Sequence, residues 1–300
     1  MRRLALAAAL LLAASPGAAA LSQTPEVVDR PEQVRTRPVR QPALTARYGP
    51  DALNVGELRL PAGRGPFPVA VTIHGGCWSK HIGETMRGIA PVADALVDRG
   101  FAVWNIEYRQ IGDPGAGWPG TFQDWGAATD HLRVLARTQP LDLKRVVVVG
   151  HSAGAYAAAF VAERPRLPAS SEVRGRDPLP VRALVALDGP TELTPFIGMD
   201  AQVCGQPVIA PLMGGTTAEH PERYAAVEPG ARLPLGVAQL QVTTAMIPPE
   251  AAEAYRAKAA AKGDRAEVLS LKGTHFDVIA PWTPNGARAV AFIADRALVR

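Results

Sequence analysis

Hydrophobic residues along the chain follow two periods, which predict two kinds of secondary structure. Short apolar runs predict strands over residues 53–60, 68–74, 101–108, 145–149, 182–188, 235–242 and 266–271. Apolar residues at helical spacing predict helices over residues 87–99, 121–138, 155–162, 249–262 and 286–299. Strands that alternate with helices in this way imply an α/β fold, with a mostly parallel sheet covered by helices on both faces.

Two segments lack these periods. Residues 21–50 are rich in Pro, Arg, Gln and Thr, and we expect an extended lead-in there. Residues 189–233 are irregular and too long for a plain connection, so we expect a small cap-like insertion over the functional edge of the sheet. Residues 51–300 show no internal repeat and no second domain, which indicates one large domain.

The N-terminal residues have the features of a secretory signal peptide. Arg2 and Arg3 precede a short Ala/Leu run, which ends in small residues up to Ala20. We expect cleavage after Ala20 and a periplasmic or secreted protein, with an uncleaved membrane anchor as the alternative. The run is short for a bilayer span and no lipoprotein cysteine follows it, so no stable membrane anchor is expected.

Charge and cysteine content narrow the choice of partners. The net charge of +4 includes Arg2 and Arg3, and the other basic residues form no stripe, so nucleic acid is not an expected partner. The two cysteines, Cys77 and Cys204, either pair in an oxidising compartment or remain separate buried thiols. The sequence has no metal-binding motif, and neither a metal nor another cofactor is expected.

The sequence Gly-His-Ser-Ala-Gly at residues 150–154 stands between a run of four valines and an Ala-rich helical segment. A strand, G-x-S-x-G and a helix in this order are the context of a nucleophile elbow. The two glycines permit a sharp turn, which would hold Ser152 at a helix N-terminus above the edge of the sheet. Ser152 is therefore the candidate nucleophile of an acyl-transfer site, and an ordinary strand-to-helix turn is the alternative.

His275, in the segment Lys-Gly-Thr-His-Phe-Asp, is the candidate general base. It follows the last predicted strand, and the C-terminal ends of parallel strands share the edge of the sheet where ligands bind. We therefore expect Ser152 and His275 to meet at that edge, within reach for proton transfer. The alternative is a histidine on the surface of a loop.

The sequence His-Gly-Gly-Cys-Trp at residues 74–78 is the candidate oxyanion loop. It leaves the apolar strand at residues 68–74, and two glycines let backbone N–H groups approach a ligand closely. We assign the oxyanion donors to the N–H groups of Cys77 and Ala153, with Gly76 as a further candidate. A tight turn beside a buried tryptophan is the alternative.

These motifs, with WNIEYR at residues 104–109, WPGTFQDW at 118–125 and GTHF at 273–276, resemble the α/β-hydrolase superfamily. More narrowly, they are similar to its bacterial esterase, arylformamidase-like and feruloyl-esterase-like branch, over residues from about 53 to 298. The resemblance implies a cofactor-free serine hydrolase with an eight-stranded sheet. It also implies catalytic Ser152 and His275, and oxyanion donors near Gly76, Cys77 and Ala153.

One feature departs from that pattern. The acid that orients the histidine usually follows the penultimate strand, but the corresponding residues 241–248 contain no carboxylate. Asp188, at the end of the preceding strand, is the favoured substitute because adjacent strands lie only about 4.8 Å apart. Glu250, Glu192 or no acid are the alternatives. We predict a hydrogen bond between Asp188 and the His275 imidazole, whereas the ordinary interpretation of Asp188 is a turn or helix cap.

Two tryptophans, Trp78 and Trp118, lie on loops at the functional edge and are predicted to line a substrate pocket. Together these features predict an exported serine esterase that cleaves small or aryl carboxylic esters through an acyl-enzyme on Ser152. An amidase or peptidase of the same superfamily is the first alternative. The second is a degenerate hydrolase that only binds its ligand, because the usual acid loop is missing.

Overall fold

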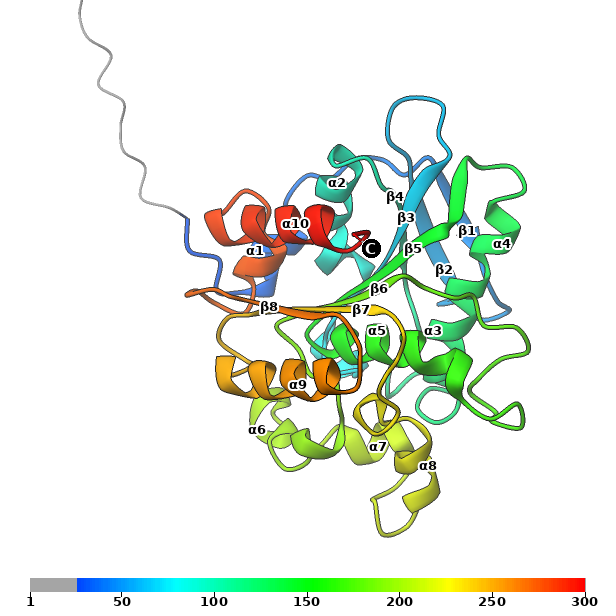
Figure 1. Cartoon of the computed structure of the whole chain (residues 1–300), viewed down its shortest axis with the longest axis vertical. Coiled ribbons are helices and arrows are strands. Elements are labelled where there is room, and N and C mark those ends of the chain that lie inside the picture. Colours follow the sequence, from blue (N-terminus) through cyan, green and yellow to red (C-terminus); the bar gives the residue numbers. More distant parts are fainter. Residues whose placement is uncertain (1–25, 300) are drawn as a thin grey trace, which may run out of the picture.

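The protein folds around one mixed sheet, seen edge-on in the computed structural model, which describes residues 26–299 (Figure 1). The eight strands lie in the order β1-β2-β4-β3-β5-β6-β7-β8. Their bounds are β1 Leu44–Arg47, β2 Val55–Arg59, β3 Phe67–Ile73, β4 Ala102–Ile106, β5 Leu141–His151, β6 Ala183–Leu187, β7 Ala238–Thr243 and β8 Ala266–Ser270. Strands β3 to β8 pair in parallel, and β1 and β2 form an antiparallel edge. This confirms the predicted α/β fold and its mostly parallel sheet.

The valine run shows why the sheet is buried on both faces. Side chains alternate along β5, so Val146 and Val148 join one hydrophobic cluster while Val147 and Val149 join the other. All four valines are fully buried. A strand covered on both sides needs apolar residues at every position, which is what the unbroken run supplies.

Helices cover both faces of the sheet (Figure 1). On one face lie α2 Ala90–Asp98 and α10 Pro284–Arg296, with the short α1 Pro31–Arg35 beside α10. On the other face lie α3 Gly120–Asp130, α5 Ala153–Glu163 and α9 Pro249–Ala261, and α4 Leu132–Leu135 continues from α3. The helix predicted over residues 121–138 is therefore divided in two, at His131.

The described part of residues 21–50 differs from the extended lead-in that we expected. It contains α1 and the edge strand β1, which pairs Leu44 with Leu58 of β2. Both elements are four or five residues long, and β1 alternates between half-buried and exposed positions. Periodicity is weak over so few residues, so the sequence pattern misses them. The expected signal peptide lies outside the described residues.

Residues 189–233 contain three short helices, α6 Asp200–Cys204, α7 Ile209–Met213 and α8 Pro221–Ala226. They lie together at one end of the molecule, below α9 in Figure 1. The segment expected to form the cap-like insertion thus contains short helices in place of a plain loop. Across residues 26–299, none of the helices combines the length and the apolar character that crossing a bilayer requires.

Candidate active site

Ser152 lies on a sharp turn between β5 and α5, with φ of 54° and ψ of −123°. A non-glycine residue rarely takes a positive φ, and this strained turn is the geometry of a nucleophile elbow. The flanking glycines allow it, because a Cβ at Gly150 would overlap the carbonyl oxygen of Gly154, and one at Gly154 would overlap that of Ile73. The amide of Ser152 donates to the carbonyl of Leu187 in β6, 2.9 Å away, which fixes the turn to the sheet.

His275 and Ser152 line the same cavity of about 150 Å³, at the C-terminal edge of the parallel strands. The Nδ1 atom of His275 lies 2.9 Å from Oδ2 of Asp188, at hydrogen-bond distance. Asp188 is fully buried, whereas the His275 side chain retains 18 % of its exposure and faces the cavity. The structure therefore brings together the three side chains that the sequence nominates as nucleophile, base and orienting acid.

Asp188 is held in place by the loop in which the sequence lacks a carboxylate. Thr244, directly after β7, donates to the Asp188 carboxylate from its amide at 2.9 Å and from its hydroxyl at 2.6 Å. The amides of Met246 and Ile247 donate at 3.1 and 3.2 Å. Burial alone would raise the pKa of Asp188, but the hydrogen bonds from His275 and Thr244 outweigh it and hold that pKa below its ordinary value. Asp188 is therefore an ionised acceptor for the imidazole.

The other two candidate carboxylates lie elsewhere. Glu192 accepts a hydrogen bond from Lys258, at 2.8 Å. Glu250 is exposed in the first turn of α9. Of the three carboxylates that the sequence nominates, Asp188 alone contacts His275.

His151 supports the base from behind, a contact that the sequence does not reveal. Its Nε2 lies 3.0 Å from the carbonyl oxygen of His275, and the two rings are 4.5 Å apart between centroids. Because a carbonyl can only accept, Nε2 of His151 carries the proton. Burial, followed by the neighbouring His275, lowers the pKa of His151 well below its usual value, so His151 stays neutral. His151 thus fixes the backbone of the loop that carries the base.

The candidate oxyanion loop has three successive positive φ values, 99° at Gly76, 55° at Cys77 and 54° at Trp78. Among the described residues, no protein acceptor takes a hydrogen bond from the N–H group of Gly76 or Cys77. Ala153 is the first residue of α5, so its N–H group has no acceptor within the helix. Cys77 and Ser152 line the same cavity. These N–H groups are therefore available as hydrogen-bond donors near Ser152.

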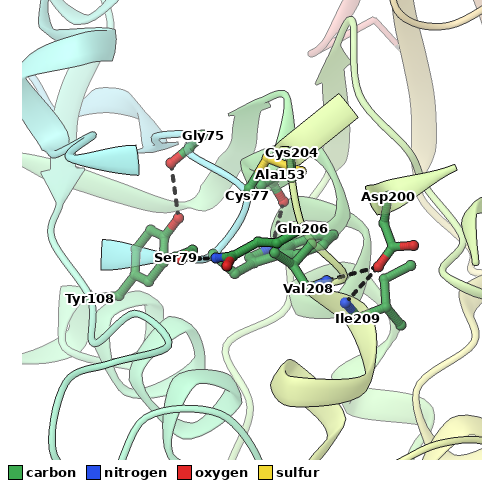
Figure 2. The surroundings of a disulfide bond; sticks show 11 residues. Gly75, Cys77, Ser79, Tyr108, Ala153, Asp200, Cys204, Gln206, Val208 and Ile209 are labelled. Carbon is green, nitrogen blue, oxygen red and sulfur yellow. Dashed lines mark hydrogen bonds between the residues drawn. A yellow bond between two sulfur atoms is a disulfide. The ribbon is translucent and has the colours of Figure 1, made fainter. Parts of the chain in front are cut away.

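Buried polar contacts hold the loop in this conformation. The Tyr108 hydroxyl donates to the carbonyl of His74 at 3.0 Å and lies 3.3 Å from that of Gly75, as Figure 2 shows for Gly75. His74 in turn is 2.7 Å from the Glu107 carboxylate. Burial disfavours the charged imidazole, but the charge and hydrogen bond of Glu107 and the hydrogen bond to the Gly75 backbone together outweigh it and raise the pKa of His74. From the sequence, Glu107 is expected to be structural rather than catalytic and Tyr108 has no assigned role, although both lie in the WNIEYR segment at residues 104–109.

A disulfide between Cys77 and Cys204 ties the oxyanion loop to α6 of the cap-like insertion (Figure 2). Their Cα atoms are 6.0 Å apart, and 127 positions separate them in the sequence. Nearby, the Asp200 carboxylate accepts from the amides of Val208 and Ile209 at 2.8 and 3.0 Å. Of the two states that the sequence left open for the cysteines, the structure shows the paired one.

The structure gives the two predicted pocket tryptophans other surroundings. Trp78 is 1 % exposed, and its indole N–H donates to the carbonyl of Ala153 at 3.0 Å. Trp118 is half-buried against Phe122 and donates to Glu172 at 2.6 Å. Neither tryptophan lines the 150 Å³ cavity beside Ser152. Trp78 instead borders a space of only about 10 Å³, which Ser152 and Cys77 also line, and links the oxyanion loop to α5.

A second, larger cavity of about 380 Å³ lies between the cap-like insertion and α9. Val203 and Met246 line both this space and the cavity beside Ser152, so the two are neighbours. Across residues 26–299, no group of three or more His, Cys, Asp or Glu side chains is arranged to hold a metal ion. The arrangement at Ser152 provides a nucleophile, a route for its proton and donors for a negatively charged oxygen.

Comparison with known proteins agrees with this geometry. The sequence profile of the BD-FAE family matches residues 57–232. No curated protein sequence matches significantly. Among solved structures, a truncated carbohydrate esterase from gut microbiota has a TM-score of 0.66 at 20 % identity, over 86 % of this chain and 98 % of the other.

Two further structures have a similar fold at low identity. The apo form of esterase 2 from Thermogutta terrifontis has a TM-score of 0.65 at 15 % identity, over 87 % of this chain and 97 % of the other. An acetyl ester-xyloside bifunctional hydrolase from Caldicellulosiruptor lactoaceticus has a TM-score of 0.59 at 13 % identity, over 85 % and 95 %. The family match covers more than half of the chain, and the chain therefore belongs to the BD-FAE family of α/β-hydrolase-type esterases and is a carboxylic-ester hydrolase.

Proposed function

We propose that the protein is an exported serine esterase that cleaves small or aryl carboxylic esters through an acyl-enzyme on Ser152. The observation that carries this proposal is the 2.9 Å contact between His275 Nδ1 and Asp188, with His275 and Ser152 on one cavity. An ionised, buried Asp188 keeps a proton on Nδ1, which leaves Nε2 as the basic nitrogen.

The reaction follows from these positions. Ser152 Oγ attacks the ester carbonyl carbon while Nε2 of His275 takes the hydroxyl proton. The carbonyl oxygen becomes an oxyanion and accepts from the N–H groups of Cys77 and Ala153, with Gly76 close by. The tetrahedral intermediate then expels the alcohol, which receives the proton from His275. Water attacks the acyl-enzyme in the same way, releases the acid and restores Ser152.

Three features support the rest of the proposal. The cavity beside Ser152 is small, which favours a small group on the substrate. Structural neighbours bear the names carbohydrate esterase and acetyl ester-xyloside hydrolase, so acetylated sugars are substrates to test beside aryl esters. The disulfide between Cys77 and Cys204 supports export, because such bonds persist in oxidising compartments. The proposed chemistry uses neither a metal nor another cofactor.

The test compares the wild-type protein with Ser152→Ala on p-nitrophenyl acetate, acetylated xylo-oligosaccharides and the matching amides. We expect ester turnover and fluorophosphonate labelling in the wild type only, and little or no amide turnover. Equal ester turnover in both proteins would remove Ser152 from the mechanism. Faster cleavage of amides than of esters would favour the amidase alternative. An intact fold without ester turnover or labelling would favour the degenerate hydrolase.

A further inference from the structure

The N-terminal segment 27–37 forms one wall of the cavity beside Ser152. Pro31 and Val34 of α1 line this cavity together with Ser152 and His275. Val34 is only 1 % exposed although it belongs to a helix of five residues at the edge of the molecule. The segment lies outside residues 57–232, which match the family profile. It is therefore a feature of this chain that the family match does not explain.

Specific contacts on both sides hold the segment against the catalytic loops. The Thr274 hydroxyl, next to His275, donates to the carbonyl of Val28. The Arg87 guanidinium donates to the carbonyl of Arg35 at 3.0 Å, and Arg35 donates to the carbonyl of Gly83 at 2.9 Å. These contacts join α1 to the loop of the base and to the residues that follow the oxyanion loop. The wall is thus a fixed part of the site.

The cavity that this wall closes is mostly apolar. Its aliphatic and aromatic lining consists of Pro31, Val34, Ile82, Val203, Met246, Phe276 and Ile279. Glu84 is the charged side chain on it, and this carboxylate faces Arg35 at 3.4 Å. A mostly apolar cavity of about 150 Å³ has room for a ligand about the size of benzene. It therefore suits an alkyl chain of a few carbons and is too small for a longer acyl group.

The neighbouring cavity between the cap-like insertion and α9 is also mostly apolar, but it is larger and carries more polar groups. At about 380 Å³ it is more than twice as large, and Thr191, Glu192, Gln202, Gln241 and Tyr255 bring polar groups to it. The greater volume and these polar groups suit an alcohol part with hydroxyl groups better than the smaller cavity does. This division leaves the cavity beside α1 for the acyl group of the ester.

We propose that α1 sets the acyl-chain limit of the enzyme, with Val34 as the specificity-determining residue on the wall of a pocket for short acyl groups. The proposal rests on the proposed esterase function. One methylene group in an apolar pocket changes kcat/KM by about ten-fold or more. Shortening or enlarging the side chain at position 34 therefore shifts the preferred chain length, while the chemistry at Ser152 stays the same.

The experiment measures kcat/KM for p-nitrophenyl esters from acetate to decanoate. In the wild type we expect a maximum among acetate, propionate and butyrate, and a steep fall beyond hexanoate. Val34→Ala should raise the hexanoate-to-acetate ratio by about ten-fold, and Val34→Phe should lower the butyrate-to-acetate ratio by a similar factor. Ile82→Ala, at a residue that lines the same cavity but is 36 % exposed, is a second variant that does not depend on core packing.

Val27→Ala is the matched control, because Val27 lies in the same segment but is 63 % exposed and does not line the cavity. It should leave the ratios unchanged. The proposal is overturned when the Val34 and Ile82 variants remain active with the chain-length profile of the wild type. It is also overturned when they alter the profile for the alcohol part in a series of acetate esters instead. Turnover that survives in Ser152→Ala refutes the esterase mechanism itself, which is a different outcome.

Discussion

Asp188 directly follows β6, yet its carboxylate hydrogen-bonds to His275 after β8 and accepts from the hydroxyl and amide of Thr244 after β7. One residue thus joins the C-terminal ends of three neighbouring strands. The loop after β7 has no acid to offer the histidine, but its N–H groups bind the acid that comes from β6. Relative to the usual pattern, in which the acid follows the penultimate strand, the acid here follows the strand before it. Its hydrogen-bond partner is still the histidine after the last strand.

Replacing Asp188 by Asn should test whether Asp188 orients His275 without disturbing the fold. The amide keeps the shape of the side chain but does not stabilise an imidazolium, and it favours the wrong tautomer of His275. We expect kcat to fall by about 10⁴-fold with a smaller change in KM. Glu192→Gln, at a carboxylate that pairs with Lys258, should retain most of the activity. If the two variants have similar kcat values, Asp188 does not orient the base.

The disulfide should contribute strongly to stability because it closes a long segment of chain. Its two cysteines are 127 positions apart, and the loop-entropy estimate for such a separation is about 5 kcal/mol. Cys204→Ser should therefore lower the free energy of unfolding by about 2–5 kcal/mol. A reductant should lower the melting temperature of the wild type but not that of Cys204→Ser, which has no disulfide. If the melting temperature of the wild type is the same with and without reductant, this expectation is wrong.

Trp78 and Trp118 should behave as structural residues in a substrate survey. Trp78→Phe keeps an aromatic ring but removes the hydrogen bond to the Ala153 carbonyl, next to the oxyanion donor. The loss of one hydrogen bond costs about 1 kcal/mol, so we expect kcat to fall by up to about ten-fold for all esters alike. Trp118→Phe should leave kcat/KM unchanged. If either variant changes the preference between esters, that tryptophan contacts the substrate.

The His74–Glu107 pair should make stability depend on pH. The folded-state pKa of His74 is raised, so its contribution is complete below the ordinary histidine pKa of about 6.5 and is lost as the pH rises through the folded value. His74→Gln should therefore reduce the free energy of unfolding more at pH 5.5 than at pH 9. His81→Gln, at an exposed histidine, is the control and should show no such trend. Urea unfolding at the two pH values measures both differences, and an equal loss at both refutes the assignment.

Much of the fold was predictable because its signals are local. The four valines of β5 identify a strand buried on both faces, and the glycines at 150 and 154 identify the turn that exposes Ser152. His275 was predictable from its place directly after the last strand. In each case the residues that produce the feature are neighbours in the sequence, so composition and period suffice to predict it.

The remaining features depend on contacts between distant residues. Whether Asp188, Glu192 or Glu250 meets His275 was decided by the pairing of β6, β7 and β8 and by the amides around Thr244. The support of His275 by His151 and the wall formed by Val34 likewise join residues far apart in the chain. The sequence by itself determined which side chains can react, because reactivity belongs to the residue and its immediate turn. Tertiary structure decided which of them meet and how much space is left for the substrate, because both depend on the packing of segments that are remote along the chain.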